Sequence, residues 1–69
     1  MNTAEIKAAR AQRAAPYHRE IRAAINEARL DPYDTDKKRT AVFYTEMAFA
    51  QHIITERERA YYLDLIAYI

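Results

Sequence analysis

The chain has 69 residues and a mass of 8.1 kDa, so it forms one small domain at most. It contains no Gly, Cys or Ser, which excludes Gly-rich phosphate loops, disulfides, thiolate zinc sites and Ser or Cys nucleophiles. Eleven basic and ten acidic residues give a net charge of +1, which excludes a strong overall attraction to nucleic acid or membranes.

The first predicted helix covers about residues 3–14, because Asn2 and Glu5 have the spacing of a capping box. Pro16 then either begins a second helix, over residues 16–30, or kinks a continuous one. Apolar side chains recur there at the helical period, which predicts one buried stripe. The stripe, which leaves His18 and the arginines outside, is Tyr17, Ile21, Ala24, Ile25 and Ala28.

A turn at residues 31–36 should separate this helix from the next, which is predicted over 36–54. Pro32 disfavours helical backbone at Asp31, and Asp34 or Thr35 can cap the following helix. Its predicted core stripe is Phe43, Met47, Ala50 and Ile54, with Val42, Phe49 and Ile53 widening it.

The charged residues 55–59 interrupt this apolar pattern. Because no Gly or Pro follows residue 36, we expect the helix to continue, or to kink mildly, into a segment over 56–69. The alternative is a new helix that begins after Thr55, which has a capping-box partner in Glu58.

The predicted fold is all-α: an antiparallel helical hairpin with an additional N-terminal helix. The C-terminal segment is too apolar to be left in water, so we expect a homo-oligomeric bundle, with a dimer favoured. The predicted oligomer interface is Tyr61, Leu65, Ile66 and Ile69. No apolar stretch approaches the ~20 residues that span a bilayer, and we expect a cytoplasmic protein.

Basic residues recur along one side of the first helix, at Lys7, Arg10 and Arg13. This spacing suits contact with phosphates or with an acidic protein surface; the alternative is an ordinary solvated face. No helix is rich in base-reading side chains, so we expect no specific DNA binding.

Tyrosine dominates the candidate partner surface. Tyr33 lies within the turn, where an exposed aromatic can anchor a partner, and Tyr44 should share one side of its helix with Ala48 and His52. Alternatively, Tyr44 and Tyr61 fill the core of an oligomer. The predicted partner-binding residues are Tyr33, Arg39, Tyr44 and His52.

Metal and catalytic sites are not expected. We interpret Asp31, Asp34 and Asp36 as capping residues, because their spacing matches no calcium-binding loop. His52 and Glu56 could ligate zinc together, but a catalytic site needs three protein ligands. We therefore predict no enzyme, no metal and no cofactor.

The segment Asp36-Lys37-Lys38, Ala41-Val42, Thr45-Glu46-Met47 and Ala50 resembles the helical hairpin domain of phage sponges for cyclic oligonucleotides that counter CBASS immunity. The family's Gly-Phe-Met cluster is replaced here by Ala50-Gln51-His52. The resemblance implies an oligomer of hairpins that sequesters a signalling nucleotide. Its implied phosphate contacts are Lys37, Lys38, Arg39 and Thr45.

From these features we expect a small non-enzymatic binding protein of a phage or mobile element that binds and inhibits a host protein. The alternative is an oligomeric sponge for a cyclic nucleotide. A third hypothesis is weak nucleic-acid binding through the basic N-terminal helix.

Overall fold

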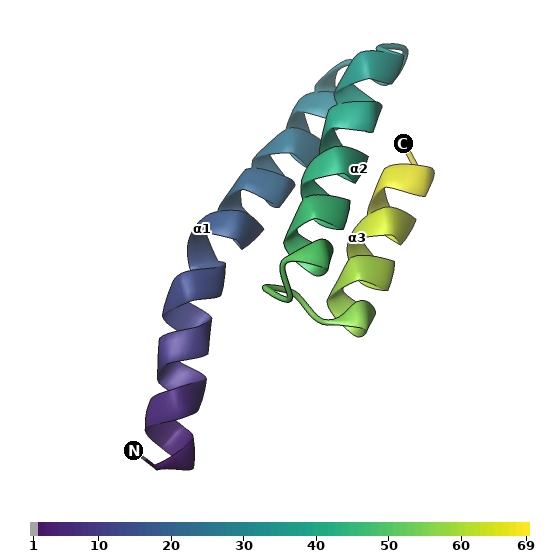
Figure 1. Cartoon of the computed structure of the whole chain (residues 1–69). Helices are drawn as coiled ribbons and strands as arrows, with labels where there is room; N and C mark the ends of the chain where they lie inside the picture. Colours follow the sequence, from purple (N-terminus) through teal and green to yellow (C-terminus); the bar gives the residue numbers. More distant parts are fainter. Residues whose placement is uncertain (1) are drawn as a thin grey trace.

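The computed structural model describes residues 2–69, which form three helices and no strand. The helices are α1 (Thr3–Leu30), α2 (Thr35–Ala50) and α3 (Glu56–Ala67). They run up, down and up, so that α2 is antiparallel to both of its neighbours (Figure 1). The predicted all-α class is confirmed. Within the described range, no helix has both the length and the apolar character needed to cross a bilayer.

The helices predicted over 3–14 and 16–30 form a single helix, α1, with Pro16 inside it. A proline inside a helix removes one backbone hydrogen bond and bends the axis. Figure 1 shows α1 changing direction in the part of the chain where Pro16 lies. Ala14 and Ala15, which precede Pro16, are strong helix formers and have no side-chain oxygen that could cap a helix. A second helix beginning at Pro16 would therefore start with uncapped N–H groups.

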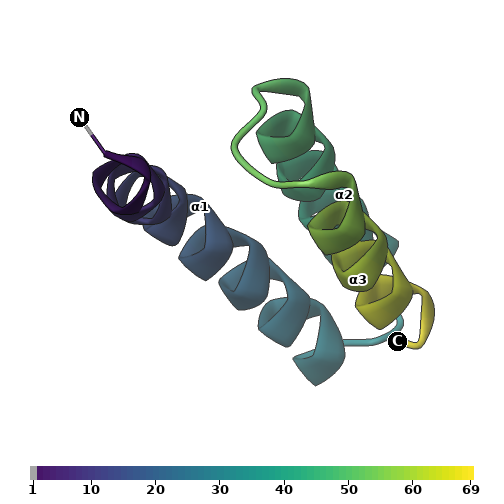
Figure 2. The same ribbon diagram turned by 90° about the horizontal axis from the view of Figure 1, so that it is seen from below.

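The N-terminal part of α1, residues 3–15, projects beyond the other two helices and is called the arm below (Figures 1 and 2). The arm gives the molecule its elongated shape, with extents of 48 × 17 × 16 Å. Its side chains are exposed as far as Arg13, and Ala14 is half-buried. The capping box of Asn2 and Glu5 is present at its start, where each residue's side chain accepts a hydrogen bond from the other's backbone N–H.

The preferred expectation of one helix through residues 55–59 is wrong, because α2 ends at Ala50. His52 adopts a left-handed backbone conformation with φ of 60°. The His52 N–H donates to the Phe49 carbonyl at 3.0 Å, and the Ile53 N–H donates to the Ala48 carbonyl at 2.9 Å. These two bonds form the Schellman motif that commonly ends helices, with His52 at the position where glycine is usual.

The capping-box alternative at Thr55 is confirmed, and it starts α3. The Thr55 hydroxyl accepts from the Glu58 N–H at 3.1 Å, and a Glu58 carboxylate oxygen accepts from the Thr55 N–H at 2.8 Å. Reversing the chain here lets α3 fold back and bury Ile54, Tyr62 and Ile66. Burial of such side chains contributes about 1.5–3 kcal/mol each, which offsets the lost helical turn.

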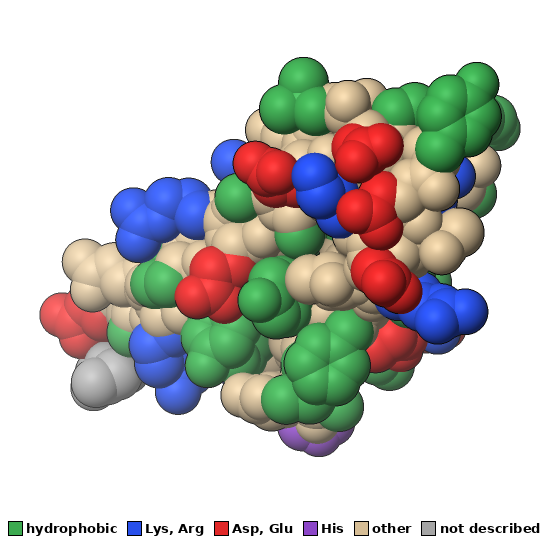
Figure 3. Space-filling model, turned by 90° about the horizontal axis from the view of Figure 1, so that it is seen from above, with side chains coloured by type: hydrophobic (Ala, Val, Ile, Leu, Met, Phe, Trp, Pro, Cys, Tyr) green, Lys and Arg blue, Asp and Glu red, His purple; other side chains and the backbone are tan. Residues whose placement is uncertain are grey.

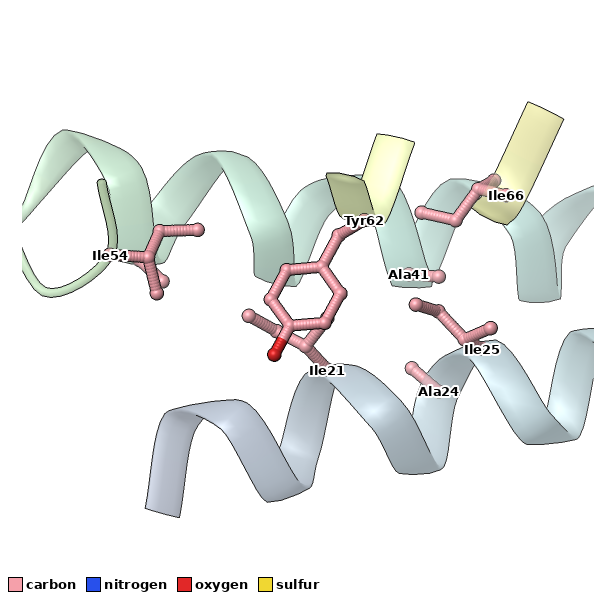
Figure 4. Packing of buried hydrophobic residues seen from close by; sticks show 8 residues of the cluster. Ile21, Ala24, Ile25, Ala41, Ile54, Tyr62 and Ile66 are labelled. Atoms are coloured by element: carbon pink, nitrogen blue, oxygen red, sulfur yellow. The ribbon is translucent and has the colours of Figure 1, made fainter. Parts of the chain in front are cut away.

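The core stripe predicted for residues 17–28 is confirmed. Ile21, Ala24, Ile25 and Ala28 are buried, and Tyr17 is half-buried against the same cluster. In Figure 4, Ile21, Ala24 and Ile25 point from α1 towards Ala41, while Tyr62 and Ile66 reach the same cluster from α3.

The core stripe predicted for α2 is wrong at Phe43, Met47 and Ala50, which are exposed. Phe43 and Met47 are 57% and 43% exposed, and the buried residues of α2 are instead Ala41, Thr45 and Ala48. These smaller side chains allow α1 and α3 to approach α2 closely, which a phenylalanine at the same positions would prevent. Ile54 of the predicted stripe belongs to the core and lies in the loop after α2, and the widening residues Val42, Phe49 and Ile53 are half-buried against it.

Candidate functional site

A cleft of about 810 Å³ lies between the arm and the loop that joins α2 to α3. It is hereafter called the arm cleft. The residues that give it chemical character are Arg10, Arg13, Tyr17, Gln51, His52 and Ile53. The arm cleft therefore unites two basic residues predicted to bind anions with His52, which was predicted to bind a partner.

Local structure on both sides explains how the cleft forms. On α1, Arg10, Arg13 and Tyr17 are three and four residues apart, which places them along one side of a helix. On the opposite wall, the left-handed turn at His52 redirects the chain, and the Gln51 and His52 side chains are exposed. The bend at Pro16 sets the angle between the arm and the rest of the bundle.

Basic groups of the cleft form no ion pair with the residues that the structure describes. Arg10, Arg13 and His52 each lack a carboxylate within 4.0 Å among residues 2–69, where the ion pairs involve other residues. By contrast, Lys37 lies 3.7 Å from Glu27 and 3.9 Å from Asp31. Two guanidinium groups without a carboxylate partner therefore line the arm cleft.

The other predicted partner-binding residues do not gather at this cleft. Tyr33 is 95% exposed at the α1–α2 turn, at the opposite end of the bundle. Arg39 is exposed and lies 3.9 Å from Asp36 within α2. Tyr44 lines a separate hollow of about 450 Å³ between α1 and α2, together with Lys37 and Thr40. Ala48, predicted to share its surface, is buried.

Two residues implied by the sponge resemblance are already engaged within the chain. Thr45 is fully buried, and its hydroxyl donates to the Ala41 carbonyl at 2.8 Å, so it cannot contact a phosphate. Lys37 joins the start of α2 to the C-terminal part of α1. Lys38 is half-buried, and Lys7 is exposed on the arm without lining the cleft. Figure 3, which views the α1–α2 end, shows acidic side chains gathered around basic ones, and the basic side chains of the arm at the left.

Part of the predicted oligomer interface packs against the core of the single chain. Ile66 is only 7% exposed because α3 folds back onto the core, so this residue is not free to hold two copies together. Leu65 and Ile69 are half-buried against the same cluster, whereas Tyr61 is 60% exposed.

Acidic residues act as caps and ion-pair partners. The Asp34 side chain accepts from the N–H groups of Asp36 and Lys37 at the start of α2. Within residues 2–69, no three His, Asp or Glu side chains lie close enough together to hold a metal ion. His52 lies in the loop and Glu56 begins α3, so the two no longer share one helical face.

Two side-chain clusters were missed by the sequence reasoning. His18, expected outside the core stripe, bonds to the Tyr62 hydroxyl, and its other ring nitrogen lies 3.3 Å from Glu58. These residues are far apart in the chain, as are Glu46 and Arg59 of the second cluster, so no local spacing could indicate either cluster.

The second missed cluster joins α2 to α3. The Arg59 Nε donates to both carboxylate oxygens of Glu46, at 3.0 and 3.1 Å, and its guanidinium carbon lies 5.1 Å from the centre of the Phe49 ring. The hydrogen bond to Glu46, together with the negative charge of that residue, raises the pKa of Arg59.

Comparison of the chain with protein-family models, curated proteins and solved structures finds no match. The proposals below rest on the residues and geometry of this chain.

Proposed function

We propose that this chain is a small non-enzymatic binding protein that docks an acidic segment of a protein partner in the arm cleft and thereby blocks that partner. The observation that carries the proposal is the pair of unpaired arginines, Arg10 and Arg13, beside the exposed His52. Guanidinium groups bind carboxylates with two parallel hydrogen bonds, which gives both affinity and orientation.

Apolar groups in the cleft support a protein partner. Tyr17 and Ile53 are half-buried, so an occupant could cover their remaining exposed surface. Arginine and tyrosine are the residues most enriched at the energetic centres of protein interfaces. A partner segment with an acidic residue beside an apolar one would match both features. We further propose that the partner is a host protein bound by a product of a phage or mobile element.

A charge-reversal experiment tests the site. The double variant Arg10→Glu/Arg13→Glu should lose at least 90% of partner capture from a host lysate, measured by quantitative mass spectrometry. The matched control is Arg19→Glu/Arg57→Glu, which makes the same charge change at two exposed positions outside the cleft. Equal capture by both double variants would contradict the proposal.

A cyclic nucleotide sponge is the second candidate, and one observation favours it. The arm cleft places two guanidinium groups, an imidazole and a tyrosine around one space, which are groups that bind phosphates and stack on bases. In this version the ligand contacts are Arg10, Arg13 and Tyr17 rather than Lys37 and Thr45.

Calorimetry with cyclic di- and trinucleotides separates the two candidates. Binding that is abolished by Arg10→Glu/Arg13→Glu and kept by Thr45→Val would favour the sponge over the protein-blocking function. Absence of heat with every nucleotide, at protein concentrations near 100 μM, would exclude a useful sponge activity.

A further inference from the structure

A hollow lined by two further arginines lies between α1 and α3, away from the arm cleft. It measures about 190 Å³ and is called the α1–α3 groove below. These two helices form the least extensively packed pair of the bundle, which leaves the groove open between them. The residues that give it chemical character are Arg22, Asn26, Arg29, Tyr61 and Tyr62.

One wall of the α1–α3 groove is cationic. Arg22, Asn26 and Arg29 are four and three residues apart, which places them along one side of α1. Both arginines are exposed, and neither lies within 4.0 Å of a carboxylate among residues 2–69. No aspartate or glutamate of that range lines the groove, whereas Glu20 and Glu27 line the hollow of about 450 Å³ between α1 and α2. The α1–α3 groove therefore suits an anionic ligand.

The opposite wall supplies an exposed aromatic ring. Tyr61 is 60% exposed, and its ring centre lies 5.6 Å from that of the buried Tyr62. This contact restricts the Tyr61 side chain before any ligand arrives, which lowers the conformational entropy lost on binding. An exposed ring that is held in place beside cationic groups is the arrangement on which nucleic-acid bases stack.

The dimensions of the groove indicate one segment of a polymer and not a compact ligand. Small-molecule pockets usually have volumes of about 300–1,000 Å³, so this smaller groove has room for a single planar ring. Arg22 and Arg29 are seven residues apart along α1, or about 10.5 Å at a rise of 1.5 Å per residue, which suits two separate phosphates. Stacking on Tyr61 requires an unpaired base, which favours a single strand over a duplex. An acidic peptide satisfies the arginines but brings no planar base to Tyr61.

We propose that the α1–α3 groove binds single-stranded nucleic acid without sequence preference, with Arg22 and Arg29 on two phosphates and a base stacked on Tyr61. Asn26, between the arginines, offers its amide to the sugar or to the phosphate. The groove shares no lining residue with the arm cleft, so this proposal stands whether or not the proposed function is correct. Because the net charge of the chain is only +1, we expect weak binding, with a dissociation constant of about 10–100 μM at low salt.

Fluorescence anisotropy with a fluorescein-labelled oligothymidine of about twelve nucleotides tests the proposal. Two phosphate contacts predict that the affinity falls about sevenfold between 50 and 200 mM NaCl. Arg22→Gln/Arg29→Gln should weaken binding at least about tenfold. The matched control, Arg10→Gln/Arg13→Gln, makes the same charge change in the arm cleft and should bind like wild type. All four arginines are exposed, so both variants should keep the circular dichroism spectrum of wild type.

The role of the aromatic ring is tested separately. Tyr61→Leu keeps an apolar side chain beside Tyr62 but removes the ring, so it should weaken binding about tenfold. Tyr61→Phe keeps the ring and should bind like wild type. Tyr44→Leu, the matched control, removes an exposed ring of α2 that lies outside the groove and should have no effect.

Lack of an anisotropy change at about 500 μM protein in 50 mM NaCl would overturn the proposal. Equal losses in the two double arginine variants would overturn it as well, because net charge and not the groove would then determine binding. Equal affinity for a duplex of the same length would exclude stacking on Tyr61. Tighter binding of a polyglutamate peptide than of the oligothymidine would assign the groove to an acidic protein segment instead.

Discussion

His18 and Tyr62 are 44 positions apart in the chain, and their side chains share a hydrogen bond between the His18 Nδ1 atom and the Tyr62 hydroxyl. The Tyr62 side chain is almost fully buried, and its ring centre lies 5.8 Å from that of His18. Glu58 contacts the other nitrogen of the same imidazole. These contacts join the middle of α1 to α3, the least extensively packed of the three helix pairs.

Removing the Tyr62 hydroxyl tests the importance of this link. Tyr62→Phe keeps the buried ring but leaves His18 Nδ1 without its partner, which should lower the free energy of unfolding by ~1 kcal/mol. Urea denaturation followed by circular dichroism measures the change. Tyr61→Phe is the matched control, because Tyr61 is exposed and makes no hydrogen bond through its hydroxyl within residues 2–69. Equal stability of the two variants would show that the bond contributes nothing.

Arg59 should not be replaceable by lysine. Arg59→Lys retains the charge but cannot reproduce the hydrogen bonds to both Glu46 oxygens or the planar contact with Phe49. We expect a melting temperature a few degrees below wild type in low salt, and a smaller difference in 1 M NaCl, where the ion pair is screened. Arg57→Lys, at an exposed position nearby, should melt with wild type. A fall of similar size in both variants would contradict this role.

The two capping boxes should differ in their effect on stability. Thr55→Ala removes the cap of α3, whose residues Tyr62 and Ile66 belong to the core, so it should cost ~1 kcal/mol of global stability. Asn2→Ala removes the cap of the arm, which projects beyond α2 and α3. It should reduce helical signal through fraying of the arm while leaving the main unfolding transition unchanged. Amide hydrogen exchange distinguishes the two, and loss of global stability in Asn2→Ala would show that the arm is part of the cooperative unit.

The left-handed backbone at His52 predicts an unusual order of substitutions. His52→Val should lower stability by ~1–2 kcal/mol, because a β-branched side chain is strongly disfavoured at φ of 60°. His52→Gly should be nearly neutral, since relief of backbone strain offsets the added freedom of the unfolded chain. If the arm cleft is the binding site, the glycine variant should still lose affinity for the partner. A valine variant as stable as the glycine variant would contradict this order.

Local sequence patterns predicted those parts of the fold that depend on interactions between residues close together in the chain. The helical class, the buried stripe at residues 21–28 and the cap at Asn2 depend on residues within one or two helical turns of one another, and all three were predicted. For α2 the local pattern left Asp34 and Thr35 open as caps, and for α3 it gave the Thr55 cap only as the alternative to a continuous helix. Packing between helices selects which side of α2 is buried. That helix has apolar residues on most of its sides, and the requirement for close packing against α1 and α3 selected Ala41, Thr45 and Ala48 over Phe43 and Met47.

The remaining features depend on contacts between distant segments. Folding of α3 onto the core stabilises a chain reversal at His52 that no glycine marks, and that reversal brings His52 to the same cleft as Arg10 and Arg13. The free energy that decides these arrangements comes from burying Ile54, Tyr62 and Ile66 against α1 and α2. This free energy arises from packing between helices, so the residue spacing within a single helix does not predict it.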